Sequence, residues 1–262
     1  MKKLSVVIPC YNEQETIAIY LNEMKKIESE LPLAFEYIFI NDGSKDDTLL
    51  ILREIADRYD NVNFISFSRN FGKEAALLAG LKATTGDFVT VMDVDLQDPP
   101  ELLPQMYQKI QEGYDIVGTR RSSRTGEPVI RSFFAKKFYQ VINQISDTEM
   151  VDGARDFRLM TRQVVDAILE LNEVNRFSKG IFSWVGFDTY YISFENRERS
   201  AGETSWNFWS LFKYSLEGII NFSEAPLTFA TLIGLGSCIM SILAMIYFFL
   251  DNLVTQNPVP GW

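Results

Sequence analysis

The chain has 262 residues, 47% of them hydrophobic, which predicts one large domain or two small ones with a sizeable core. Its 25 Lys and Arg residues against 35 Asp and Glu give a net charge of −10, which argues against a protein that binds nucleic acid through a basic surface. The sequence contains no histidine, which excludes imidazole bases, Ser-His and Cys-His nucleophiles, and histidine-ligated zinc or iron sites.

Short β-rich runs alternate with helical patterns through the first half of the chain. The apolar run before Pro9 is too short for a signal peptide, so we expect no export by that route. The predicted strands are residues 4–9, 35–41, 63–67, 88–92 and 115–118, with helices over residues 13–30 and 45–59. This alternation predicts βαβ units and an α/β fold with a mostly parallel, Rossmann-like sheet.

Polar residues follow each predicted strand. They are residues 11–13, 42–44, 69–70, 93–95 and 120–121. Because ligands of such sheets bind beyond the carboxyl ends of the strands, these residues are the first candidates for chemistry.

Asp93 and Asp95 form the strongest local signal, at the end of an apolar run. Alternation along a continuing strand would place both carboxylates on one side, with Gln97 able to turn toward them. Such oxygen ligands suit Mg²⁺ or Mn²⁺. The alternative is a turn with capping aspartates that leads into a helix at Pro99. An EF-hand loop is excluded because Asp98 stands where that loop requires glycine.

Residues 225–250 contain no charge and predict a transmembrane helix. At 1.5 Å per residue such a helix is about 39 Å long, against about 30 Å for the hydrocarbon core of a bilayer. A buried helix of a soluble protein is the alternative. Residues 131–142 and 206–216 mix cations with aromatic side chains, which is typical of helices in the headgroup layer. For the first of these segments, an ordinary amphipathic helix on the sheet is the alternative.

Small residues recur at a spacing of four within the apolar run. Ala230 with Gly234, and Ser237 with Ser241, would allow close packing against another helix, as in a homo-oligomer. Small residues that simply face lipid are the alternative.

Six stretches, taken in order, carry a resemblance to a known family. They are residues 6–13, 41–44, 69–73, 93–97, 156–159 and 199–205. Together they resemble family 2 glycosyltransferases of GT-A fold, and in particular the polyprenyl-phosphate glycosyltransferases. That branch includes dolichyl-phosphate mannose synthases and bactoprenol glucosyltransferases. The last two stretches, Asp-Phe-Arg-Leu and Arg-Ser-Ala-Gly-Glu-Thr-Ser, are the more specific ones.

The resemblance implies a site for a nucleotide sugar and a divalent metal. The residues implied to bind the nucleotide are Pro9, Tyr11, Glu13, Asp42, Lys73 and Asp93. The implied cofactor is Mg²⁺ or Mn²⁺, which would bridge the donor diphosphate. The implied metal ligands are Asp95, Gln97 and Asp93.

Three arginines are implied to bind the phosphates of donor or acceptor, because guanidinium groups match phosphate oxygens bidentately. They are Arg120, Arg131 and Arg199, with Arg121 as an alternative to Arg120. A solvated surface charge is the plain alternative for each one taken alone.

The implied reaction is a single displacement in which an acceptor phosphate attacks the anomeric carbon and inverts it. A monophosphate with a second pKa of about 6 is mostly dianionic at pH 7, so it needs little deprotonation. Asp95 and Asp156 are the catalytic candidates. Asp156 would act as a base or position the acceptor, or it would pair with Arg155 or Arg158 to order the site.

The predicted organisation is a catalytic domain over residues 1–205, a juxtamembrane helix over 206–224, a transmembrane helix over 225–250 and a tail over 251–262. Thr204 and Trp206 depart from the residues common in the family's acceptor loop. Members of the bactoprenol branch commonly carry two membrane helices, so we expect the chain to stop before a second one.

The preferred donor is UDP-glucose, ahead of UDP-GlcNAc and GDP-mannose, and the expected acceptor is polyprenyl phosphate such as undecaprenyl phosphate. Membrane lipids are expected partners and nucleic acid is not. We expect a cell-membrane enzyme whose catalytic domain faces the cytoplasm. Two alternatives are a membrane-anchored glycosyltransferase that extends a polysaccharide or lipid-linked oligosaccharide, and a catalytically idle nucleotide-binding scaffold.

Overall fold

A seven-stranded sheet forms the centre of the computed structural model, which describes residues 1–122, 137, 139–146, 148, 150–173, 175–195, 216 and 218–255. The spatial order of the strands is β3-β2-β1-β4-β6-β5-β7. The strands are β1 (Lys3–Cys10), β2 (Ala34–Asn41), β3 (Val62–Ser66), β4 (Phe88–Val91), β5 (Ile116–Arg121), β6 (Ala154–Thr161) and β7 (Thr189–Phe194).

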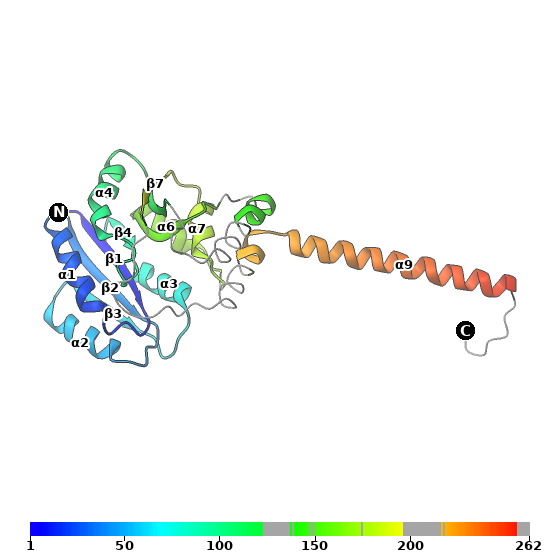
Figure 1. Cartoon of the computed structure of the whole chain (residues 1–262), viewed down its shortest axis with the longest axis horizontal. Coiled ribbons are helices and arrows are strands. Elements are labelled where there is room, and N and C mark those ends of the chain that lie inside the picture. Colours follow the sequence, from blue (N-terminus) through cyan, green and yellow to red (C-terminus); the bar gives the residue numbers. More distant parts are fainter. Residues whose placement is uncertain are drawn as a thin grey trace.

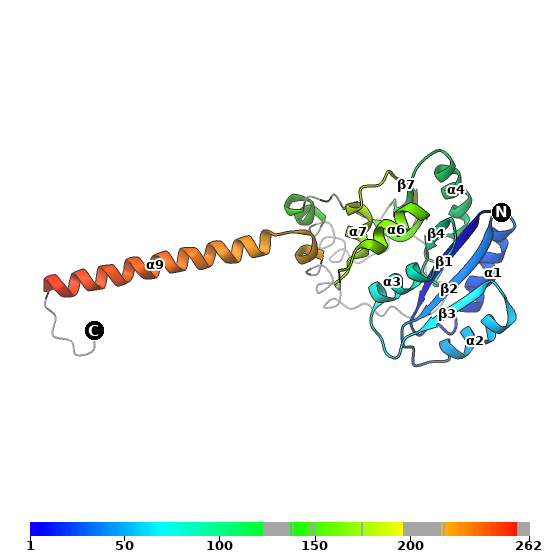
Figure 2. The same ribbon diagram turned by 180° about the vertical axis from the view of Figure 1, so that it is seen from behind.

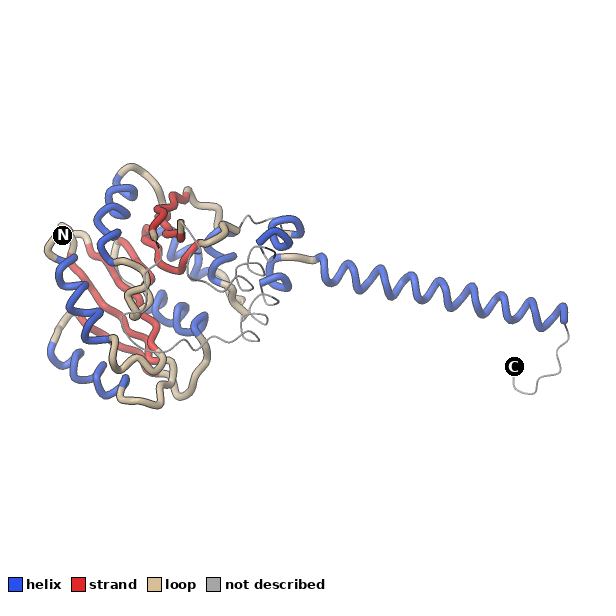
Figure 3. Tube along the Cα trace, in the orientation of Figure 1, coloured by secondary structure: helices blue, strands red, loops and turns tan. Residues whose placement is uncertain are grey.

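Helices cover both faces of this sheet (Figures 1, 2 and 3). One face carries α1 (Ile17–Glu28), α2 (Thr48–Arg58) and α4 (Leu103–Gln111), with the short 3₁₀ helix η1 (Pro100–Leu102) before α4. The other face carries α3 (Lys73–Ala83), α6 (Arg162–Glu170) and α7 (Ser178–Trp184). Alternation within β1 serves both layers, because Val6 and Ile8 join the first core and Val7 joins the second.

The register of the strands brings several loops to one edge of the sheet. β1 pairs in parallel with β2 and with β4, and β2 pairs in parallel with β3. β6 runs antiparallel to β4, with Val91 opposite Arg158, so β6 begins where β4 ends. β5 is also antiparallel to β6 and ends on the same side. We call this side, where β1 to β5 end and β6 begins, the carboxyl edge.

The mostly parallel α/β sheet is confirmed, and the five predicted strands occur with small changes at their ends. β6 and β7 were not predicted. The expectation of a continuing strand through Asp93 and Asp95 is wrong, because β4 ends at Val91 and the chain turns at residues 94–95. Leu96 takes a left-handed φ of 56° in this reversal. Pro99 and Pro100, which follow, lack the N–H donors that a strand inside a sheet requires.

The long apolar helix is also confirmed. α9 (Ala225–Thr255) has 31 residues. The most apolar 18-residue window of its segment Ala225–Val254 has a mean hydropathy of 2.2, and none of that window is buried. It projects away from the sheet (Figure 1), so the alternative of a buried helix does not hold. By length and composition this helix could cross a membrane.

The two expected interfacial helices fall largely outside the described residues. Residues 131–136, 138 and 206–215 belong to that part, while residues 139–145 and 218–222 are helical. The expected boundaries at residues 205, 224 and 250 stay predictions.

Candidate active site

The loops that follow β1 and β2 are tied to each other at the carboxyl edge. The N–H of Asn12 donates to Ser44 Oγ at 2.9 Å, and Asn12 Oδ1 accepts the N–H of Lys45 at 2.9 Å. The N–H of Glu13 donates to Thr48 Oγ1 at 2.8 Å. Asn12 has a φ of 55°, a conformation that asparagine tolerates better than most residues. These bonds make the two loops one connected rim.

Pro9, Tyr11 and Glu13 belong to the same end of β1. Pro9 pairs with Ile40 in the sheet, and Tyr11 and Glu13 follow directly in the loop, where both are half-buried. The Glu13 carboxylate accepts the hydroxyl of Thr16 at 2.7 Å. The structure therefore places all three at the carboxyl edge, and their contact with a nucleotide stays a prediction.

Asp42 anchors the loop that leads into α3. Its side chain is buried, and its two oxygens accept the N–H groups of Phe71 at 2.7 Å and Gly72 at 2.9 Å. Burial raises the pKa of Asp42, and these two backbone hydrogen bonds oppose that shift. Next to it, Gly43 has a φ of +65°, and a Cβ there would lie 2.3 Å from the carbonyl carbon of Arg69. The close approach of the Arg69 backbone explains why residue 43 is glycine. Each oxygen of Asp42 keeps a lone pair that could accept a ligand hydroxyl.

Lys73, the first residue of α3, bridges two carboxylates from different strands. Its Nζ lies 2.7 Å from Asp93 Oδ1 and 2.6 Å from Asp156 Oδ2. The register of β4 and β6 explains why Asp93 and Asp156 face each other across the edge. The exposed fractions of the three side chains are 29% for Lys73, 27% for Asp93 and 16% for Asp156. This trio is the electrostatic centre of the carboxyl edge.

The bridge fixes the charge states of its members. Burial alone would raise the pKa of Asp156, but the charges of Lys73 and Lys179 outweigh it and hold that pKa far below its ordinary value. Burial alone would lower the pKa of Lys73, but Asp156 and Asp93 raise it well above the usual range. Asp156 is therefore a carboxylate, and Lys73 an ammonium, across the neutral range of pH.

The sequence left open a pairing of Asp156 with Arg155 or Arg158, and the structure gives Asp156 an ion pair with Lys73 from α3. Arg158 is buried and donates to main-chain carbonyls, to Asp156 O at 3.2 Å and to Arg155 O at 2.8 Å. Its guanidinium also lies 3.6 Å from the ring centre of Phe182. Local spacing suggested a pair within β6, but Nε and Nη2 of Arg158 donate to the backbone, and the Asp156 carboxylate turns to Lys73.

Arg155 forms a second ion pair, which the sequence did not predict. Its Nε lies 2.7 Å from Oδ1 of Asp98, a carboxylate only 1% exposed, and its Nη2 makes a long contact of 3.5 Å with Gln97 Oε1. The other oxygen, Asp98 Oδ2, is buried without a hydrogen-bond partner among the described residues. Burial raises the pKa of Asp98, and Arg155 offsets part of that shift. The pair holds the turn after β4 against β6.

The turn after β4 carries the predicted metal ligands. Asp95 is 3% exposed, and its Oδ1 accepts the N–H of Gln97 at 3.0 Å. Among the described residues, no three or more Asp, Glu or Cys side chains form a group that could hold a metal by itself. The carboxylates of Asp93 and Asp95 with the amide of Gln97 instead fit a hard cation that completes its shell with substrate phosphates and water. Metal binding by these three residues stays a prediction.

The predicted phosphate-binding arginines divide into two groups. Arg120 and Arg121 end β5 at the carboxyl edge, where Arg120 is exposed and donates Nε to Ser193 Oγ at 2.9 Å. In the part of the chain that the structure describes, Arg120 forms no hydrogen bond or ion pair with Lys73, Asp93 or Asp156. Arg131 and Arg199 lie outside the described residues, as do Thr204 and Trp206.

Comparison with known proteins gives a consistent result. A family model described as glycosyl transferase family 2 matches residues 5–169. The chain is 44% identical over 260 residues to the bactoprenol glucosyl transferase of Shigella phage SfX, covering 99% of this chain and 85% of that protein. It is 42% identical over 259 residues to the putative glycosyltransferase CsbB of Bacillus subtilis (strain 168), covering 99% and 78%.

A solved structure supports the fold. Glucosyl-3-phosphoglycerate synthase from Mycobacterium tuberculosis, in complex with Mn²⁺, UDP-glucose and phosphoglyceric acid, has a TM-score of 0.56 and 21% sequence identity to the chain. The match covers 83% of this chain and 77% of that one. It confirms the predicted GT-A fold.

Proposed function

The chain belongs to glycosyl transferase family 2, and we propose that it transfers glucose from UDP-glucose to a polyprenyl phosphate, with inversion at the anomeric carbon. The observation that carries this proposal is the 44% identity to a bactoprenol glucosyl transferase, which runs through the carboxyl edge and α9 alike. Extension of a polysaccharide and an idle scaffold are not favoured, since several further relatives also bear the bactoprenol glucosyl transferase name.

The donor would bind across the ends of β1, β2 and β4. Pro9, Tyr11, Glu13 and Asp42 would hold the base and ribose, where the connected loops already present polar groups. Asp93, Asp95 and Gln97 would hold Mg²⁺ or Mn²⁺ together with the diphosphate. When bound, such a cation offsets charge on the diphosphate and so makes it a better leaving group.

We assign Asp156 a positioning role instead of that of a general base. An effective base has a pKa near the working pH, whereas Lys73 holds the pKa of Asp156 far below it. A phosphate acceptor needs no base, because its second pKa of about 6 leaves it mostly dianionic at neutral pH. Arg120, Arg131 and Arg199 would supply guanidinium groups for that dianion, and Lys73 would help to bind the nucleotide.

α9 would anchor the enzyme beside its lipid acceptor. Its apolar segment Ala225–Val254 is long enough to cross a bilayer, and a polyprenyl chain is confined to that bilayer. A sugar-nucleotide donor is a cytoplasmic metabolite, so the residues before α9 would face the cytoplasm. Access of trypsin to these residues in sealed inside-out vesicles, but not in right-side-out ones, would test this orientation.

The reaction is tested with purified full-length protein in detergent. Radiolabelled UDP-glucose, UDP-GlcNAc and GDP-mannose are each offered with undecaprenyl phosphate, in Mn²⁺, in Mg²⁺ and in EDTA, and product is counted in the organic phase. We expect label from UDP-glucose in the lipid phase, abolished by EDTA and lowered at least about 100-fold by Asp95→Asn. Label from another donor would correct the sugar. Failure of every donor, with folded protein and intact substrates, would overturn the proposal.

A further inference from the structure

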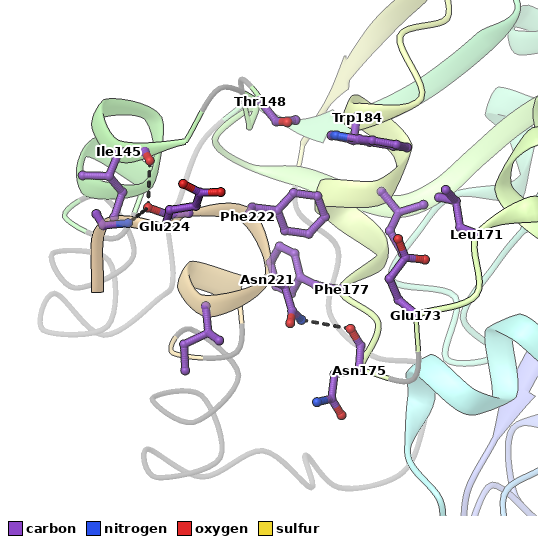
Figure 4. Close-up of a pocket in the computed structure, with 14 residues that line it drawn as sticks. Ile145, Thr148, Leu171, Glu173, Asn175, Phe177, Trp184, Asn221, Phe222 and Glu224 are labelled. Atoms are coloured by element: carbon purple, nitrogen blue, oxygen red, sulfur yellow. Dashed lines mark hydrogen bonds between the residues drawn. The ribbon is translucent and has the colours of Figure 1, made fainter. Parts of the chain in front are cut away.

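A cavity whose described lining residues include none of the Lys73 bridge lies where α7 meets the residues that lead into α9 (Figure 4). Its volume is about 490 Å³, within the range of small-molecule sites. Much of its wall is apolar and includes Phe177, Ile181, Trp184 and Phe222. The cavity is therefore large and apolar enough to take a length of hydrocarbon chain.

The position of this cavity points to the membrane. Ala225, the first residue of α9, is one of its lining residues. Two other lining residues have exposed apolar side chains, Trp184 at 56% and Ile220 at 66%. Val141, one helical turn before the lining residue Ile145, is 43% exposed. Exposed apolar side chains and the start of α9 therefore line the same cavity, and tryptophan favours the interface between headgroups and acyl chains.

The charge of the cavity selects among lipids. Glu173 and Glu224 line it, and none of the fourteen described residues that line it is Lys or Arg. Neither carboxylate forms an ion pair with a cation in the described ranges. Amide groups of Asn175 and Asn221 complete the polar part of the lining. Two carboxylates repel a phosphate monoester, such as that of the proposed acceptor, and attract an ammonium group.

We propose that this cavity binds a membrane phospholipid whose headgroup ends in an ammonium group. One acyl chain would lie along Ile181 and Phe222, and the ammonium would lie beside Glu173 or Glu224, which line opposite sides of the cavity (Figure 4). The site is separate from the one proposed for sugar transfer and does not depend on the identity of the donor or acceptor. It requires only that α9 lies in a bilayer.

α7 connects this lipid site with the carboxyl edge. The far end of α7 carries the lining residue Trp184, while at its first residue, Ser178, both the N–H and the hydroxyl donate to Glu74 Oε2, the N–H at 3.0 Å. Glu74 is the neighbour of Lys73 in α3. A lipid that packs against α7 would therefore stabilise a helix that is hydrogen-bonded to the residue beside the Lys73 bridge.

The test is native mass spectrometry of the full chain in non-ionic detergent, titrated with dioleoyl phosphatidylethanolamine or with dioleoyl phosphatidylglycerol. The two lipids share their acyl chains and differ in the ammonium. We expect one ethanolamine lipid per chain, bound roughly tenfold more tightly than the glycerol lipid. The double variant Glu173→Gln/Glu224→Gln should lose this preference. Glu30→Gln/Glu112→Gln, which removes two exposed carboxylates elsewhere, should keep it.

Two further measurements keep the test decisive. Trp184→Ala shortens the apolar wall at an exposed position and should weaken binding of both lipids several-fold, with the thermal unfolding temperature of the protein nearly unchanged. Undecaprenyl phosphate added at equal concentration should not displace the ethanolamine lipid. Equal binding of the two lipids by the wild type, a preference that survives loss of both glutamates, or displacement by undecaprenyl phosphate would each overturn the proposal.

Discussion

Replacing Lys73 by methionine removes the cation between Asp93 and Asp156 while keeping the length of the side chain. Each carboxylate now loses its ion pair, at 2.7 Å and 2.6 Å, and the two negative charges are left facing each other. All three side chains are less than one third exposed, so water screens the loss only in part. Breaking a buried ion pair costs about 3–5 kcal/mol, and we take the lower end, about 3 kcal/mol, because these groups still touch solvent.

The assay is thermal unfolding of the full chain in detergent with EDTA present. For a domain of this size, about 3 kcal/mol corresponds to a fall in Tm of roughly 6–12 °C. Lys82→Met is the matched control, because Lys82 is an exposed residue in the last turn of the same helix. Its Tm should stay within about 2 °C of the wild type.

The loss of stability in Lys73→Met should also change with pH in a definite direction. In the wild type the lowered pKa of Asp156 confers stability that is present above the ordinary carboxyl value and lost only as pH falls through the folded value. The raised pKa of Lys73 confers stability below the ordinary lysine value that is lost only as pH rises through the folded value. The contribution of the bridge is therefore constant from pH 5 to 9.

Without Lys73 the two carboxylates repel, and one of them gains a raised pKa. The fall in Tm of Lys73→Met relative to the wild type should therefore become smaller as pH falls from 8 to 5. A Tm equal to that of Lys82→Met, or a deficit that does not change with pH, would refute the bridge as the electrostatic centre of the site.

Two other substitutions test the frame around the site. Arg155→Met should cost about 3–5 kcal/mol in the free energy of unfolding by urea, because Asp98 is left charged in a buried position. Adding Asp98→Asn should recover part of that loss, and no recovery would contradict the ion pair as its cause. Gly43→Ala should cost more than about 2 kcal/mol, since its φ of +65° adds to a clash of the new Cβ with the loop before α3. Gly113→Ala has a φ of +113° but open space, so it should cost less, and equal losses would rule out the clash.

The sequence identified the elements that depend on local pattern. Alternating apolar residues mark β1 and β2, and an uncharged run marks α9. Because the carboxyl ends of parallel strands meet at one edge, the same pattern predicted that Asp42 and Asp93 lie there. The contacts of the chain with nucleotide, metal and acceptor stay predictions.

The pattern of neighbouring residues could not predict contacts between segments that lie far apart in the sequence. β6 carries charges at Arg155, Asp156 and Arg158, which obscured it as a strand, and its antiparallel register is what turns Asp156 toward Lys73. Spacing alone favoured partners one or two residues away. The buried Asp98 likewise depends on a partner from another strand, which only the order of strands in the sheet reveals.

We propose that the carboxyl edge holds the donor diphosphate and a divalent metal through Asp95. Titration of the purified chain with Mn²⁺, followed by the electron paramagnetic resonance signal of the free ion, tests it with UDP present or absent. We predict tight Mn²⁺ binding that requires UDP, weakened at least about tenfold by Asp95→Asn and unchanged by Asp57→Asn, an exposed aspartate of α2. Mn²⁺ and UDP binding to folded Asp95→Asn with the wild-type affinity would contradict the claim.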